Sequence, residues 1–328
     1  MTFMDETAGT SRARLARASR HHLTLELAET ARLALPMALT QLSQIAMMTT
    51  DLAFIGRLGG EAVAAAALAG TVYFVSFTFG MGLTSAVAPL AAQAFGADHV
   101  LARLWRIDWS LMRQLFVIGL PISLAFLLEY GMFSAAALLM GLIGTSALAA
   151  HQIALQVTAI LFMIPFGISM AATVRVGQAV GRNDAAGVRR AGLVAMLLGI
   201  AIALVLTFAV VATRFDIAAF FLGTAADNAA ATIALAATLL LVGASFFVTD
   251  AMQSIAVGSL RGLKDTHIPL LFAGMGYWLI GFPLSWLLGF HTGLGATGVW
   301  VGLSIGTAVY ATLLVLRFQR LTRTGAPP

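Results

Sequence analysis

Three carboxylic acids lie inside long apolar stretches of this sequence, and their placement indicates chemistry rather than solubility. Of the 14 acidic residues, only Asp51, Glu129 and Asp250 fall inside such stretches. An ionised side chain at the centre of a membrane helix costs roughly 2.5–3.5 kcal/mol on insertion scales. Each acid is therefore expected to bind a cation or a proton. The alternative is a protonated acid that donates an interhelical hydrogen bond.

Polar side chains accompany the first of these acids. Gln41, Gln44 and Met48 recur at helical spacing and share a helix face with Asp51. The thioether of Met48 can repack around ligands of different shape. We therefore expect this face to line a substrate cavity.

Polar residues also lie near the other acids. Gln253 follows Asp250 by three residues, so the two side chains are neighbours on one helix face. His151 and Gln152 form a polar patch in a different apolar stretch. We expect all of these to line the cavity. For His151, an interhelical hydrogen bond is as good an interpretation as a proton relay.

The stretches that carry these residues are long enough to cross a bilayer. Apolar residues make up 60% of the chain and charged residues 10%, against roughly 45–50% and 25% in soluble domains. A spanning helix needs about 20 mostly apolar residues. The sequence therefore predicts an all-α, polytopic integral membrane bundle, with tilt or a kink in the long second and sixth spans. About eight such runs occur, near residues 33–55, 64–94, 116–142, 147–174, 191–213, 231–258, 268–290 and 297–316.

The basic residues follow the orientation of the spans. With the N-terminus in the cytoplasm, 17 of the 19 basic residues fall in cytoplasmic segments, and only Arg57 and Arg214 lie outside. This is the bias of the positive-inside rule. Both termini are therefore expected in the cytoplasm, and no nucleic-acid partner is predicted despite the basic balance.

The sequence also contains an internal repeat. When the chain is shifted against itself by 85 residues, 18 of the 64 positions from Leu33 to Gly96 are identical without a gap. Gly82 falls on Gly167, and Gln93-Ala94 with Gly96 falls on Gln178-Ala179 with Gly181. Although Ala- and Leu-rich helices match often by chance, the shared Pro, Gly and Gln positions favour a duplication.

The two copies of the repeat are unequal in length. The second contains six predicted spans, whereas the first has only two before the second begins. Four spans are therefore expected to be missing after Gly96, and an even number leaves every later span with its orientation. We predict a cytoplasmic tail (1–32), a two-helix segment left from a first lobe (33–96), a cytoplasmic join (97–115), a six-helix lobe (116–318) and a second tail (319–328).

No motif in the sequence predicts an enzyme. The chain has no cysteine, and it lacks the H-E-x-x-H, phosphate-loop and G-x-S-x-G patterns. Residues 293–298 satisfy G-x-G-x-x-G, but they join two membrane spans without a preceding strand, so a dinucleotide site is not expected. We predict no bound cofactor.

Several stretches resemble the multidrug and toxic compound extrusion family of cation-coupled efflux transporters. The resemblance extends from about Leu25 to Arg320. It rests on Leu35-Pro36 through Asp51 to Gly60, Ala149–Leu155, Ala171 through Gly181-Arg182, Leu260–Thr266 and Gly293–Trp300.

The resemblance implies roles for the acids. Members of this family have twelve helices in two six-helix lobes, and this chain resembles helices one, two and seven to twelve. Asp51 then corresponds to the family's first-helix aspartate, which is implicated in cation coupling. Glu129 and Asp250 correspond to carboxylates associated with Na⁺ in one branch. Phe246 stands where that branch has a tyrosine, so one hydroxyl ligand is absent and Phe246 becomes a cavity residue.

The function implied is antiport of amphipathic or cationic drugs against Na⁺ or H⁺, in the plasma membrane of a bacterium. Two alternatives remain open at this stage. One is a flippase for a lipid-linked sugar, which the scarcity of intramembrane Arg and Lys disfavours. The other is a membrane protein that no longer transports because four helices are lost. The oligomeric state, the substrate and the choice of ion are not predicted.

Overall fold

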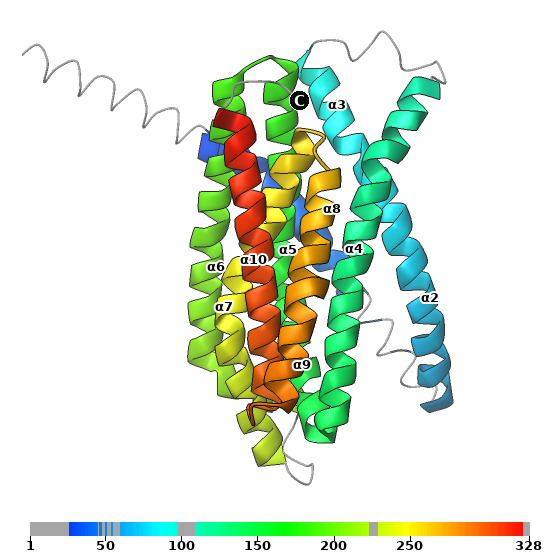
Figure 1. Cartoon of the computed structure of the whole chain (residues 1–328), viewed down its shortest axis with the longest axis vertical. Coiled ribbons are helices and arrows are strands. Elements are labelled where there is room, and N and C mark those ends of the chain that lie inside the picture. Colours follow the sequence, from blue (N-terminus) through cyan, green and yellow to red (C-terminus); the bar gives the residue numbers. More distant parts are fainter. Residues whose placement is uncertain are drawn as a thin grey trace, which may run out of the picture.

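The computed structural model describes residues 26–44, 46–47, 50, 54, 60–97, 109–222 and 229–323. All regular structure in these ranges is helical, and no strand occurs among them. The helices lie roughly side by side in one elongated bundle (Figure 1). This confirms the predicted all-α fold class. Lipid cannot hydrogen bond to the backbone, so each spanning segment must satisfy its own amides and carbonyls as a helix does.

The N-terminal part contains a helix over residues 26–44, followed by α2 (Gly60–Ser85) and α3 (Val87–Gly96). α2 and α3 together form the predicted second span, and a break separates them at Ala86. Pro89 explains the break. It has no N–H to give to the carbonyl of Ser85, four residues earlier, and its ring crowds that carbonyl. The expected kink is therefore present here.

The rest of the described chain contains six spans, which we call the six-helix lobe. Its first four helices are each continuous over 34 to 38 residues, and the predicted sixth span, α7, shows no break. The penultimate span consists of α8, a π-helical segment η1 and α9 in direct succession. The elements are α4 (Trp109–Ile143), α5 (Thr145–Gly181), α6 (Ala185–Leu222), α7 (Ala229–Gly262), α8 (His267–Ala273), η1 (Gly274–Gly281), α9 (Phe282–Phe290) and α10 (Ala296–Arg323).

Seven spans in the described ranges are long and apolar enough to cross a membrane. They correspond to the second through eighth predicted spans. Most helices extend beyond the apolar runs, as α6 does relative to the predicted 191–213. The first predicted span, 33–55, is helical at its described positions, and the remainder lies outside the described residues.

Close packing of α5 against α7 holds the centre of the lobe together. A Cβ on Gly258 would overlap the backbone of Ser169, so the glycine lets the two backbones approach. Ser169 Oγ donates to the carbonyl oxygen of Ser254 at 2.6 Å, and Thr173 Oγ1 donates to that of Gly258 at 2.8 Å. These bonds fix the register of α7 and therefore the height of its polar residues in the bundle.

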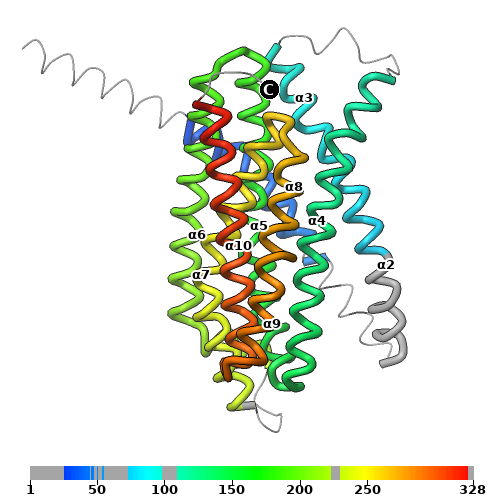
Figure 2. The backbone as a smooth tube through the Cα atoms, viewed as in Figure 1, coloured from blue at the N-terminus to red at the C-terminus, as the bar shows by residue number. Residues whose placement is uncertain are grey.

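The two-helix segment packs against the lobe through reciprocal contacts. α2 crosses α4, and α3 lies against α5 (Figure 2). A Cβ on Gly82 would overlap Ser123, and a Cβ on Gly167 would overlap Ala38. Under the 85-residue shift Gly82 corresponds to Gly167, and Ala38 corresponds to Ser123. Each contact is therefore the counterpart of the other.

A second pair of contacts has the same reciprocity. A Cβ on Gly96 would overlap the carbonyl of Gln178, and a Cβ on Gly181 would overlap the carbonyl of Gln93. The shift again relates the two glycines and the two glutamines. Such exchange of partners is what a two-fold interface between equivalent units gives. The contacts thus agree with the duplication inferred from the sequence.

Several helix ends gather at one end of the bundle. The end of α3, the α5–α6 turn, the α7–α8 turn and the end of α10 all lie at the top of Figure 1. Ion pairs join elements here: Arg175 on α5 binds Glu26 and Glu29 of the first helix, and Arg317 Nε contacts Asp265 Oδ2 at 2.8 Å. This is the end that the charge distribution assigns to the cytoplasm.

Candidate functional site

Two of the predicted acids meet inside the six-helix lobe. Glu129 comes from α4, and Asp250 and Gln253 come from adjacent turns of one face of α7. Gln253 Nε2 donates to Glu129 Oε1 and to Asp250 Oδ1, at 3.1 Å each. One amide therefore bridges the two carboxyl groups across the α4–α7 boundary.

A tyrosine that the sequence analysis did not select completes this group. Tyr277, in η1, donates its hydroxyl to Glu129 Oε1 at 3.2 Å. Phe246 lies one turn before Asp250 and is 1% exposed, with its ring edge-on to Phe133 and Trp300 at 6.0 Å each. The hydroxyl that Phe246 does not supply is thus present on another helix. A tyrosine inside an apolar span is itself a signal, because its buried hydroxyl needs a partner.

The electrostatics of the pair favour a bound cation. Asp250 is only 5% exposed, and the two carboxyl groups share a single amide. Two ionised carboxylates this close repel one another strongly in a dry setting. Within the described ranges no three His, Asp or Glu side chains gather into a metal-binding group. A positive charge placed between the two carboxyl groups would reduce this repulsion.

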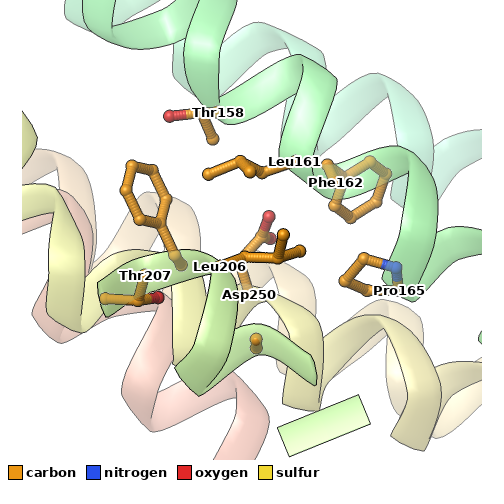
Figure 3. Close-up of a pocket in the computed structure, with 9 residues that line it drawn as sticks. Thr158, Leu161, Phe162, Pro165, Leu206, Thr207 and Asp250 are labelled. Atoms are coloured by element: carbon orange, nitrogen blue, oxygen red, sulfur yellow. The ribbon is translucent and has the colours of Figure 1, made fainter. Parts of the chain in front are cut away.

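Asp250 lies in an apolar pocket between α5, α6 and α7. Figure 3 shows its carboxylate among side chains of these helices. The pocket is small, with a cavity volume of about 10 Å³. A space of this size holds about one water molecule beside the carboxylate, so a larger ligand requires the surrounding helices to move apart. Its lining residues are Thr158, Leu161, Phe162, Pro165, Ala203, Leu206, Thr207, Phe247 and Asp250.

A second cleft lies beside the first and contains Glu129. It is also small, with a cavity volume of about 20 Å³, and Phe126, Phe162 and Phe166 form much of its apolar wall. Gln253 lines it too, so the bridging amide adjoins this cleft while Asp250 lines the other. Arg261, which the predicted topology placed in a cytoplasmic segment, also lines this cleft.

His151 makes the contact of an interhelical hydrogen-bond acceptor. It is fully buried, and its Nδ1 accepts from Trp300 Nε1 on α10 at 3.2 Å. Gln152, the next residue, is exposed. The structure therefore places neither side chain among the groups that contact the carboxylates, and Trp300 links His151 to Phe246 through ring contacts.

The polar face of the first helix is only partly described. Gln41 is half-buried and Gln44 is exposed. Asp51 and Met48, predicted for coupling and for the cavity respectively, lie outside the described residues. The structure thus assembles the candidate site from Glu129, Asp250 and Gln253, and adds Tyr277.

The fold and the site define a multi-pass helical membrane protein with a carboxylate pair inside its bundle. A family model described as MatE matches residues 36–102 and 121–287. The chain belongs to this family, the one that its sequence resembles. Of the two matched segments, the first is much the shorter.

Similar proteins include a probable multidrug resistance protein NorM of Bradyrhizobium diazoefficiens. It is 45% identical over 444 aligned positions, covering 92% of this chain and 95% of the relative. A protein of the same name from Rhodopseudomonas palustris is 42% identical over 439 positions, covering 91% and 92%. Since 92% of 328 residues is about 302, about 140 positions of the first alignment have no counterpart in this chain.

Solved structures with the same fold are also transporters by their titles. The Vibrio cholerae MATE transporter VcmN in the bent form has a TM-score of 0.82 at 13% identity, covering 92% of this chain and 98% of that chain. The eukaryotic MATE transporter AtDTX14 has a TM-score of 0.80 at 16% identity, covering 92% and 98%.

Proposed function

We propose that this chain is a secondary active multidrug transporter that exchanges amphipathic or cationic drugs for Na⁺ or H⁺. It acts in the plasma membrane of a bacterium, with both termini in the cytoplasm. The single observation that carries the proposal is the Glu129–Gln253–Asp250 bridge, in which Asp250 and Gln253 are buried and Glu129 is half-buried. The names of the relatives, probable multidrug resistance proteins, support the substrate class.

The carboxylate pair gives a physical basis for coupling. Without a bound cation, the two ionised carboxylates share one amide donor and repel one another. This repulsion acts to separate α4, which carries Glu129, from α7, which carries Asp250. A bound Na⁺ or proton removes that repulsion. Because the ion then favours one relative position of the helices over another, its gradient can drive a conformational change. For Na⁺, the oxygens of Glu129 and Asp250 are the proposed ligands.

Drug recognition is proposed at the two clefts, which must widen to admit a drug. Both adjoin the carboxylate pair, and both have walls of phenylalanine and other apolar side chains. A drug with an aromatic body and a positive charge can bury its aromatic body in a cleft and place its positive charge near a carboxylate. A cation at the pair then competes with the drug for the same negative charge, which is the relation that an antiporter needs.

The length of the alignment gap supports the division into two unequal units. About 140 positions are absent, and helices α4 to α7 contain 34 to 38 residues each. The gap is thus the length of four such helices. We propose that residues 33–96 are the remaining part of a first lobe and that residues 116–318 form the complete second lobe.

Substitution of the pair tests the proposal. Glu129→Gln and Asp250→Asn keep the shape of each side chain and remove its charge. Each is expected to abolish ion-dependent drug efflux, and ion-dependent release of bound drug from the purified protein, without loss of expression. Asp216→Asn is the matched control, since Asp216 is exposed on α6. Ion-dependent efflux and release that persist in the Glu129→Gln/Asp250→Asn double variant would refute the assignment.

A further inference from the structure

One side of α2 and α3 has no covering helix in the described part of the chain. Residues that contact the six-helix lobe, such as Gly82 and Ala86, lie on the other side. Ala86 keeps helical angles (φ −67°, ψ −19°), so the helical spacing continues from α2 into α3. The uncovered side has a row of residues at alternating spacings of four and three, the pattern of a helix–helix contact. We call this row the seam, and its members are Tyr73, Phe77, Gly80, Thr84, Val87, Ala91 and Ala94.

The equivalent row in the six-helix lobe is a closed contact between helices. The 85-residue shift places the seam on a row of α5, and α5 packs against α6 and α7. Val87 is 50% exposed, whereas its equivalent, Ala172, is 0% exposed. The hydroxyl of Ser169, the equivalent of Thr84, donates to the carbonyl of Ser254 on α7. All members of the row on α5 are buried except the partly buried Phe162, and they are Thr158, Phe162, Pro165, Ser169, Ala172, Val176 and Ala179.

The seam differs from the side of α2 that faces lipid in both units. Val75 is 40% exposed, and its equivalent on α5, Ile160, is 37% exposed. Position 75 therefore faces outward with or without further helices, whereas position 87 is exposed only in the unit that lacks equivalents of α6 and α7. The helix that follows α3 is α4, and it packs against α2 from the side of the lobe. No described segment of the chain itself covers the seam.

We propose that the seam pairs with the seam of a second copy of this chain. Both copies have the same orientation in the membrane, so their α2 and α3 helices run parallel and the two seams meet across a two-fold axis. Small residues such as Gly80 and Ala91 let two helices approach closely, and such close packing attracts helices to one another in lipid. The hydroxyl of Thr84 donates to carbonyls of its own helix, and it can donate across the contact as Ser169 does.

This pairing covers the seam without rebuilding the first lobe. The seam faces away from the lobe, and α2 lies at the edge of the bundle (Figure 1). The second copy therefore adds no helix beside Glu129 or Asp250. The inference goes beyond the proposed transport function and does not depend on it, because two copies pair whether or not either extrudes drugs.

Single-molecule photobleaching of the full chain tests the pairing. A dye is attached at Ala185→Cys, an exposed position at the start of α6. The labelled protein is reconstituted at low density in liposomes of phosphatidylethanolamine and phosphatidylglycerol, so that unrelated copies rarely share a liposome. With the seam unaltered, most liposomes are expected to bleach in two steps. Single-step bleaching would show that lipid covers the seam and would refute the pairing.

Substitutions locate the contact. Ala91→Phe should weaken the pairing about tenfold, since the added ring forces the two helices apart. Thr84→Leu is a second test of the seam and should also weaken the pairing. Val75→Phe is the matched control, because position 75 faces lipid and the two-step fraction should be unchanged. Equal losses from Ala91→Phe and Val75→Phe would refute the seam as the site of pairing.

Two further measurements use the same chain. A version with the missing positions of the Bradyrhizobium relative grafted after Gly96 should bleach in single steps, because the added helices cover the seam. The chain has no cysteine, so Val87→Cys alone should give a disulfide-linked dimer under mild oxidation in the membrane, whereas Val75→Cys should not. Two-step bleaching by the grafted version, or a disulfide at position 75 and none at position 87, would place the association elsewhere and overturn the proposal.

Discussion

At the scale of single residues, the ion site depends on hydrogen bonds that reach Glu129 from two helices. Gln253 donates from α7 and Tyr277 from η1, both to the same oxygen, Oε1. Both donors stabilise the ionised carboxylate and orient it toward Asp250. A π-helical segment changes the direction of its side chains relative to an α-helix, and such segments are frequent at functional sites. The position of Tyr277 in η1 is therefore part of the site.

The first prediction concerns this hydroxyl. Tyr277→Phe removes one donor to Glu129 and leaves the ring contact with Tyr310. If the pair binds Na⁺, the concentration for half-saturation should rise about tenfold, because a hydrogen bond to a charged group contributes about 1.5 kcal/mol or more. Ion-dependent release of bound rhodamine 123 measures the change. Tyr130→Phe is the control, since the Tyr130 ring packs on Phe74 at 4.5 Å. Equal effects from the two variants would contradict a specific role for Tyr277.

The sequence could predict some of these residues and not others. Asp250 and Gln253 share a helix and differ by three positions, so helical spacing alone relates them. Glu129 lies on a different helix, and only the family resemblance joined it to Asp250. To predict Tyr277, one must know which face of η1 packs toward α4. The periodicity of its apolar span does not give this face. The packing of helices against one another, which is a tertiary property, decides all such pairs.

Arg261 shows how a hydropathy boundary can mislead. The predicted sixth span ended at residue 258, ahead of the charged residues, whereas α7 continues to Gly262. A long side chain near a helix end can turn back along the bundle, with its stem on apolar surface. Hydropathy therefore located the span correctly but ended it one turn early, ahead of Arg261.

At the scale of elements, the contact between α2 and α4 holds the two-helix segment on the lobe. Ser123 Oγ donates to the carbonyl of Phe79 at 2.8 Å, across the two helices. Gly82, one turn further, lets the backbones meet. In membranes such close approach of small residues provides much of the attraction between helices, because lipid is as apolar as the side chains. The site's helix α4 therefore depends on α2 for part of its packing.

The second prediction compares two nearby glycines that lie on opposite sides of α2. Gly82→Ala should destabilise the protein by about 1–3 kcal/mol, because the added Cβ overlaps the backbone of Ser123 and the helices must separate. Gly80→Ala should be neutral or slightly stabilising, since no atom lies within 4 Å of its Cβ position and alanine favours helix. Thermal unfolding in detergent measures both. Equal losses for the two variants would show that the α2–α4 contact is looser than described.

At the scale of the whole molecule, both the reciprocal contacts and the charge distribution depend on parallel orientation of the repeated units. A further contact joins Ala92 to Gly177. The 85-residue shift relates these two residues to each other, so this contact is its own counterpart. Residues at such a position lie close to the two-fold axis. Because the ends of α3 and α5, which the shift relates, lie at the same end of the bundle (Figure 1), this axis runs along the length of the bundle, as in transporters with parallel repeats.

The third prediction tests the orientation. The chain has no cysteine, so single cysteines report without background. Ala185→Cys, exposed at the start of α6, is expected to be cytoplasmic and to resist an impermeant maleimide in intact cells. Thr224→Cys, outside the described residues, is expected to react, since the positive-inside rule places it on the opposite side. Labelling of position 185 with position 224 silent would invert the proposed topology, and permeabilised cells give the control for accessibility.

The last prediction concerns what two unequal units can do. Alternating access requires one rigid body to move against another around a central site, and the six-helix lobe has only two helices opposite it. Those helices already contact α4 and α5 through tight glycine positions, so they follow the lobe rather than enclose a cavity with it. We therefore expect the chain to insert and to bind drugs and ions, but to extrude drugs near the background of cells that carry an empty vector.

A version with the missing positions of the Bradyrhizobium relative grafted after Gly96 should extrude drugs in an ion-dependent manner. Drug accumulation in efflux-deficient bacteria at matched expression compares the two, and Glu129→Gln in the grafted version shows that its activity uses the same carboxylate. Equal, ion-dependent extrusion by both versions would contradict this prediction. It would mean that another body replaces the missing helices, and association of two copies of the chain is the physical route.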